Sequence, residues 1–145
     1  EKLISVGRFR PAQLVYEGIL KRDSTDPQLL NNLAYVSQKV GDERAVDYAR
    51  QAVETAPDHP GFLDTYGWIL AENGEPERGL KMLRDAYTRQ STNEEIRYHI
   101  ALALLRLDRH DAARRELDAA VASQREFPSR AEARALLEQL GDATN

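Results

Sequence analysis

The chain has 145 residues, enough for one domain whose core needs no disulfide or metal to hold it. Its 24 acidic and 20 basic residues give a net charge of −4, which argues against a general nucleic-acid binder. There is no cysteine, which excludes disulfides, thiol catalysis and cysteine-ligated zinc, and there is no apolar run long enough to span a membrane.

An internal repeat with a period of about 34 residues organises the chain. Three segments align with one another: 27–59, 60–93 and 94–127. In each segment, apolar residues recur three and four positions apart in two stretches, which predicts two amphipathic helices joined by a turn. Neither helix could bury its apolar stripe alone, so we expect successive hairpins to stack around a continuous core.

The first segment, 1–26, matches only the second half of a repeat, through Gly7, Ala12 and Tyr16. Residues 1–6 are therefore predicted to be the end of a helix whose beginning is absent. We expect the chain to be a fragment of a longer repeat protein.

Turns and helix starts follow from local signals. Proline is placed in the first helical turn by Asp26–Pro27 and by His59–Pro60. Two capping boxes are predicted, Thr92 with Glu95 and Ser129 with Glu132. The turns inside the three repeats are expected at Gly41, Gly74 and Asp108.

Small residues recur where the two helices of a hairpin must approach each other. They are Ala34, Gly67 and Ala101 in the first helices and Ala45, Gly79 and Ala113 in the second. Gly67 is predicted to be a packing glycine, at which any residue larger than alanine would separate the two helices.

The last segment, 128–145, is predicted to hold a single helix over 129–140 and a polar tail. Four apolar residues lie on one face of this helix, and Gly141 is expected to end it. A lone helix that covers the last hairpin is the usual cap of a repeat array. The four residues are Ala133, Leu136, Leu137 and Leu140.

These features resemble the tetratricopeptide repeat family. The middle segment follows the family pattern at Leu63, Tyr66, Gly67, Leu70, Gly74, Gly79, Leu83 and Ala86. Departures include Ser37 at an aromatic position and Arg97 at a large apolar position. The resemblance implies an all-α solenoid of antiparallel helix hairpins with a C-terminal capping helix.

The strings at 31–35, 63–70 and 95–101 are similar to the C-terminal repeats of bacterial tetratricopeptide lipoproteins associated with exopolysaccharide and exosortase-type (PEP-CTERM) protein sorting. This closer resemblance implies a periplasmic or outer-membrane-associated setting. Composition alone leaves the compartment open, so a cytoplasmic location stays an alternative.

No arrangement typical of an enzyme is found. His59, His99 and His110 lie on different predicted elements without the spacing of paired metal ligands, and no phosphate-binding glycine loop or nucleophile elbow is present. We therefore expect no catalytic residue, no metal site and no cofactor.

In the family, the first helix of each hairpin faces the inside of the superhelix, which implies a concave groove. Tyr35, Trp68 and Leu102 occupy equivalent positions and should lie side by side there, although Trp68 could instead pack between neighbouring first helices. The clamp that binds acidic C-termini in chaperone-type arrays is not expected, because its positions hold one amide and no lysine. The predicted groove residues are Asn31, Tyr35, Gln38, Lys39, Asp64, Trp68, Glu72, Tyr98, Leu102 and Arg106.

Two functions follow. The first is a binding module that holds a peptide or partner helix in the groove, within a larger envelope-associated assembly. The second is a structural spacer whose repeats contact only one another. Exposed Tyr35 and Trp68 would favour binding, and buried rings would favour the spacer.

Overall fold

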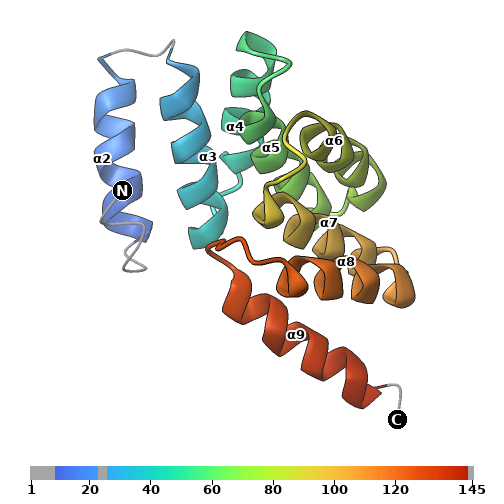
Figure 1. Cartoon of the computed structure of the whole chain (residues 1–145). Coiled ribbons are helices and arrows are strands. Elements are labelled where there is room, and N and C mark those ends of the chain that lie inside the picture. The colour runs from blue at the N-terminus through green and yellow to red at the C-terminus, as the bar shows by residue number, and fades with distance from the viewer. Residues whose placement is uncertain (1–8, 23–25, 144–145) are drawn as a thin grey trace.

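A computed structural model of the chain describes residues 9–22 and 26–143, and this part folds as eight α-helices without a strand (Figure 1). The helices are α2 (Phe9–Leu20), α3 (Pro27–Val40), α4 (Ala45–Thr55), α5 (Pro60–Glu72), α6 (Pro76–Arg89), α7 (Glu94–Arg106), α8 (His110–Ala122) and α9 (Arg130–Ala143). The predicted all-α fold class is confirmed. The predicted first-helix remnant over 1–6 lies outside the described residues.

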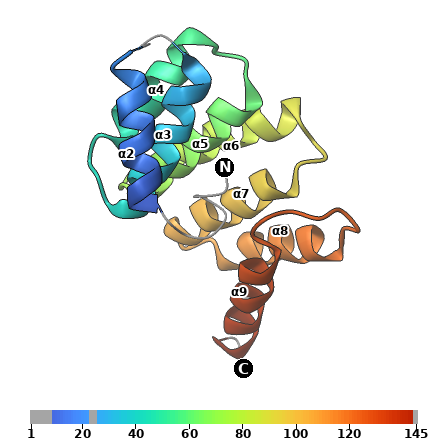
Figure 2. The same cartoon turned by 90° about the vertical axis from the view of Figure 1, so that its left-hand side faces the viewer.

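Consecutive helices pack on one another from α2 at one end of the array to α9 at the other (Figures 1 and 2). Three of them also contact in succession, α3 against α5 and α5 against α7. We call these three the inner helices. They begin at Pro27, Pro60 and Glu94. The division of the chain into repeats at these residues stays a prediction.

Two inner helices begin as their prolines suggest. The Asp26 carboxylate accepts hydrogen bonds from the backbone N–H groups of Gln28 (2.9 Å) and Leu29 (3.4 Å). At α5, the His59 ring accepts from the Phe62 N–H (3.3 Å) and stacks on the Phe62 ring. These side chains satisfy amide groups that have no partner within the helix.

The three predicted turn residues all adopt the left-handed conformation. Their φ angles are 78° at Gly41, 93° at Gly74 and 57° at Asp108. Glycine is favoured there because it has no Cβ, and aspartate is one of the few other residues that enter this region readily. Equivalent turns therefore share one backbone geometry despite different residues.

The predicted capping boxes are wrong. Helix α7 is capped by Asn93, whose side-chain oxygen accepts from the Glu95 N–H (3.0 Å), and Thr92 precedes the cap. At the start of α9, the Ser129 N–H and hydroxyl donate to the carboxylate of Glu95 (2.9 and 2.6 Å). The acceptor for Ser129 thus comes from α7, whereas the sequence predicted Glu132.

The end of α9 also differs from the expectation. The helix continues through Gly141 to Ala143, so Gly141 does not terminate it. A glycine within a helix carries only a modest penalty, and its φ is not in the left-handed region that a glycine terminator needs.

Helices α5 and α6 touch through two glycines. A Cβ on Gly67 would lie 2.8 Å from the carbonyl oxygen of Gly79 and 2.8 Å from Cγ of Leu83. A Cβ on Gly79 would collide with the carbonyl oxygen of Gly67. Gly67 is therefore a packing glycine, and the contact is tighter than expected, because even alanine does not fit.

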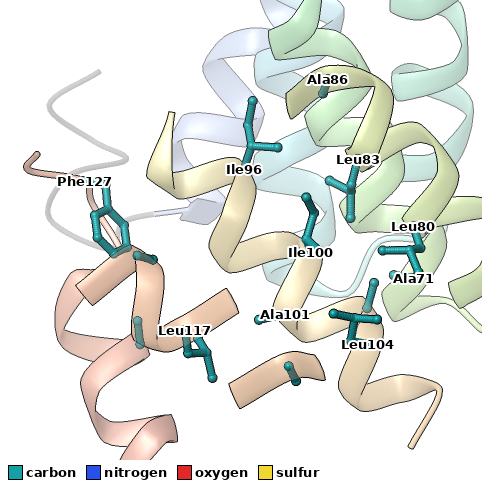
Figure 3. Packing of buried hydrophobic residues seen from close by; sticks show 14 of the residues in the cluster. Ala71, Leu80, Leu83, Ala86, Ile96, Ile100, Ala101, Leu104, Leu117 and Phe127 are labelled. Carbon is teal, nitrogen blue, oxygen red and sulfur yellow. The ribbon is translucent and has the colours of Figure 1, made fainter. Parts of the chain in front are cut away.

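The apolar core continues from these hairpins into the last helix. Leu83 of α6, Ile96 and Leu104 of α7, and Leu117 of α8 are almost completely buried in one cluster (Figure 3). The α9 residues Ala133, Leu136, Leu137 and Leu140 pack against the same cluster. Helix α9 thus covers the apolar end of the array, as a capping helix should.

The glycine contact generates a stability prediction. Gly67→Ala should lower the melting temperature, because overpacking costs about 1–3 kcal/mol and outweighs the roughly 1 kcal/mol that alanine gains over glycine in a helix. Gly18→Ala in α2 is the matched control, since no atom lies within 4 Å of its added Cβ. The control should melt at the same or a higher temperature. If Gly67→Ala behaved like Gly18→Ala, the close approach of α5 and α6 would be refuted.

Candidate interaction groove on the inner helices

The inner helices enclose a groove of about 540 Å³. Its residues come from the last two turns of each inner helix, where positions three or four apart share a face. The lining residues are Gln38 and Lys39 of α3, Trp68 and Glu72 of α5, and Leu102, Leu105 and Arg106 of α7.

Six of the ten predicted groove residues line this groove: Gln38, Lys39, Trp68, Glu72, Leu102 and Arg106. Leu105 also lines it and was missed, although its spacing of three from Leu102 could have indicated it. The structure places the other four predicted residues, Asn31, Tyr35, Asp64 and Tyr98, on the same three helices but outside this groove. That any of them binds a partner stays a prediction.

A row of rings lies beneath the groove. The Tyr35 ring meets the edge of Phe9 (centroids 6.2 Å apart) and lies 5.4 Å from the Trp68 ring. The indole then stacks on the His99 imidazole at 5.6 Å. Trp68 is only 7% exposed and Tyr35 is half-buried. Trp68 therefore packs between neighbouring inner helices and forms the floor of the groove.

His99 occupies the centre of a buried polar cluster that the sequence did not reveal. Its Nδ1 donates to a carboxylate oxygen of Asp64 on α5 (2.7 Å), and its Nε2 lies 3.5 Å from the carboxylate of Glu95. The Glu95 carboxylate also accepts hydrogen bonds from the backbone N–H and the hydroxyl of Ser129, just before α9. The four-residue spacing from Glu95 to His99 was visible in the sequence, but the contact with Asp64 depends on how α5 and α7 stack.

The cluster changes the protonation of the imidazole. Burial disfavours the charged form, but the carboxylates of Asp64 and Glu95 outweigh burial and the opposing charge of Lys39, so the pKa of His99 is raised. Burial, together with the carboxylates of Glu132, Glu95 and Glu72, raises the pKa of Tyr98 to about 12. These carboxylates make the part of the inner face near Tyr98 electronegative.

Of the two basic residues at the rim of the groove, Arg106 has a carboxylate partner and Lys39 contacts an aromatic ring. Arg106 donates to the Glu72 carboxylate at 2.6 Å, which joins α7 to α5. The Arg106 side chain is 56% exposed and that of Glu72 is 20% exposed, so solvent reaches the pair from the Arg106 side and its contribution to stability is about 0–1 kcal/mol. The Lys39 ammonium lies 5.3 Å from the Trp68 ring centroid, and no ion pair joins it to a carboxylate of the described residues.

Other chemistry has little support in the described part of the chain. Within residues 9–22 and 26–143, no group of three histidine, aspartate or glutamate side chains is placed to hold a metal ion. His59 serves as a helix cap, and His110 is exposed at the start of α8. None of the described helices combines the length and apolar character needed to cross a bilayer.

The raised pKa of His99 gives a pH prediction. A group that binds its proton more tightly when folded adds stability below its unfolded-state pKa, and this stability is lost as pH rises through the folded-state value. Between about pH 6 and about pH 9, unfolding free energy should therefore fall more in the parent chain than in His99→Gln. Denaturant titrations measure it, with His110→Gln as the exposed-histidine control. Equal losses in the parent and His99→Gln would refute the charged cluster.

Comparisons with known proteins agree with this architecture. A tetratricopeptide repeat family model matches residues 70–140. No curated protein matches the chain in sequence. Among solved structures, the chain is similar to MamA (TM-score 0.71, 17% identity, covering 99% of this chain and 82% of that one). It is also similar to MamA 41-end from Desulfovibrio magneticus RS-1, with a TM-score of 0.73 and 16% identity, covering 99% of this chain and 80% of that one. A third similar structure is TTC0263, a thermophilic TPR protein in Thermus thermophilus. Its TM-score is 0.61 at 19% identity, and the match covers 96% of this chain and 93% of that one.

At these identities the solved structures show the fold alone. The family model adds independent sequence support over α6 to α9 and the end of α5. Together with the repeat pattern and the left-handed turns at equivalent positions, these findings identify residues 70–140 as tetratricopeptide repeats and show that the described chain has the tetratricopeptide repeat fold.

Proposed function

We propose that this chain is a non-enzymatic interaction module whose inner groove binds an extended peptide or a partner helix. The tetratricopeptide fold is in general that of a protein–protein interaction scaffold. The observation that carries the finer proposal is the groove itself, which combines apolar walls from Leu102 and Leu105 with charged and amide groups at its rim. Such mixed lining suits a segment that inserts apolar side chains and positions them with polar contacts.

The buried indole changes which residues would contact the partner. Trp68 has little surface to offer, and its removal would open a hole between α3, α5 and α7. The contact residues are instead the half-buried Leu102 and Leu105 and the polar ends of Gln38, Lys39, Glu72 and Arg106.

The spacer function is the second candidate, and the burial of Trp68 is the observation that favours it. A spacer needs inner helices that are satisfied by one another, and the ring row and the Glu72–Arg106 pair provide such contacts. The two candidates differ in one outcome, which is whether any segment binds the groove of the folded chain.

The setting of the protein is also a proposal. The resemblance of residues 31–35, 63–70 and 95–101 to envelope lipoproteins supports a bacterial envelope-associated assembly. Cell fractionation of the native protein tests it, and recovery with the cytoplasmic fraction alone would contradict it.

Selection from a random peptide library tests the binding proposal. Peptides that bind the parent chain should lose about tenfold or more in affinity against Leu105→Arg, because a charge would occupy the apolar wall. The matched control is Leu14→Arg on α2, where Leu14 is 61% exposed and does not line the groove. Trp68 is the only tryptophan, so its fluorescence reports binding directly.

Thermal melting establishes that both variants are folded. If no peptide is selected, or if folded Leu105→Arg and Leu14→Arg bind selected peptides equally, the groove does not bind peptides. The spacer function would then be the better account.

A further inference from the structure

Lys39 holds its ammonium against three aromatic rings at the rim of the groove. The nitrogen lies 5.9 Å from the ring centroid of Phe9, 5.7 Å from Tyr35 and 5.3 Å from Trp68. Each ring face attracts the cation, and the rings of Tyr35 and Trp68 also contact each other in a tilted arrangement. A side chain restrained in this way loses less conformational freedom when it binds a further group.

The carboxylates of the inner helices near the groove already have partners. Glu72 is paired with Arg106, Asp64 with His99, and Glu95 with Ser129. Among the described residues no carboxylate pairs with Lys39, although its side chain is exposed to solvent. Its positive charge is therefore available to a ligand.

The apolar wall of the groove lies beside this charge. Lys39 lines the same groove as Leu102 and Leu105, which come from α7 on the other side of α5. A bound segment that placed a carboxylate at Lys39 would bring its neighbouring side chains over these leucines. The Glu72–Arg106 pair, being internally neutralised, adds little net charge to this part of the rim.

We propose that Lys39 recognises a carboxylate of the bound segment, so that the groove selects a peptide in which an acidic residue stands close to an apolar one. This rests on the proposed function and specifies its partner. The interaction is distinct from the clamp of chaperone-type arrays, whose positions here hold Asn31, Tyr35, Thr65, Glu95 and His99. Recognition comes from a single cation that aromatic rings hold in place.

Glu132 of α9 adds a negative charge on the side of the inner face where Tyr98 lies. Its carboxylate acts on Tyr98 and Tyr35, and both phenols have a raised pKa, caused first by burial and then by Glu132 and Glu95. Glu132 is exposed, so water and salt screen its field at Lys39.

The test uses peptides selected from a random library against the parent chain. For a selected peptide, two versions are synthesised, one with the acidic residue and one with the matching amide, Asp→Asn or Glu→Gln. Both are measured against the parent, Lys39→Met and Lys81→Met. Methionine keeps an unbranched apolar side chain on the rings and removes the ammonium group with its charge. Lys81 on α6 is exposed and does not line this groove, so it is the matched control.

Acidic residues beside apolar ones should be enriched among the selected peptides. Lys39→Met should weaken the acidic version about tenfold and leave the amide version nearly unchanged, because only the acidic version uses the cation. Lys81→Met should change neither. Added salt should weaken the acidic version on the parent chain and have little effect on Lys39→Met.

The experiment distinguishes failure of carboxylate recognition from failure of the proposed function. Groove-bound peptides without acidic enrichment, or an equal loss of both versions in Lys39→Met, would overturn carboxylate recognition and leave the groove proposal standing. An equal loss would mean that Lys39 only supports the rings. Peptides that are insensitive to Leu105→Arg, or no peptides at all, would overturn the proposed function together with this inference.

Discussion

The contact of the His99 imidazole with Asp64 and Trp68 is the interaction on which the inner face depends. It joins α7 to α5 through a hydrogen bond of 2.7 Å and a ring stack at 5.6 Å, and the indole carries the connection on to Tyr35 of α3. A buried polar group is tolerated only when it is hydrogen-bonded, and here both ring nitrogens face carboxylates. The three inner helices are thus fixed relative to one another by this hydrogen bond and these ring contacts as well as by their apolar core.

In this arrangement, the side chains that hold the helices together differ from those that keep surface in the groove. Trp68 and His99 are committed to holding the helices, whereas Lys39, Leu102 and Leu105 keep surface in the groove. The same cluster extends to the end of the array. The Glu95 carboxylate lies beside His99 and also accepts a hydrogen bond from the backbone N–H of Ser129, just before α9. The capping helix is therefore connected to the floor of the groove by one carboxylate, and both depend on the position of α7.

Sequence reasoning predicted what the repeat dictates locally. The turns at Gly41, Gly74 and Asp108 and the close contact at Gly67 follow from spacing, because each hairpin must turn and close in the same way. It missed the contact of His99 with Asp64 on α5 and that of Glu95 with Ser129 in the turn before α9, each about one repeat away in sequence. Such contacts depend on side-chain directions between stacked helices, and no local pattern records them. The burial of Trp68 could not be predicted for the same reason. A side chain at its position in the repeat can either project into the groove or pack between the inner helices.

A double-mutant cycle between Asp64 and His99 tests most directly whether this contact holds the inner helices together. Unfolding free energies of the parent, Asp64→Asn, His99→Gln and the double variant are compared near pH 6, where the imidazole carries its proton. Residues in direct contact show coupling of about 0.5–3 kcal/mol, and a favourable coupling in this range is the predicted result. Additivity of the two substitutions within about 0.3–0.5 kcal/mol would contradict the account, because it would mean that α5 and α7 are held without this contact.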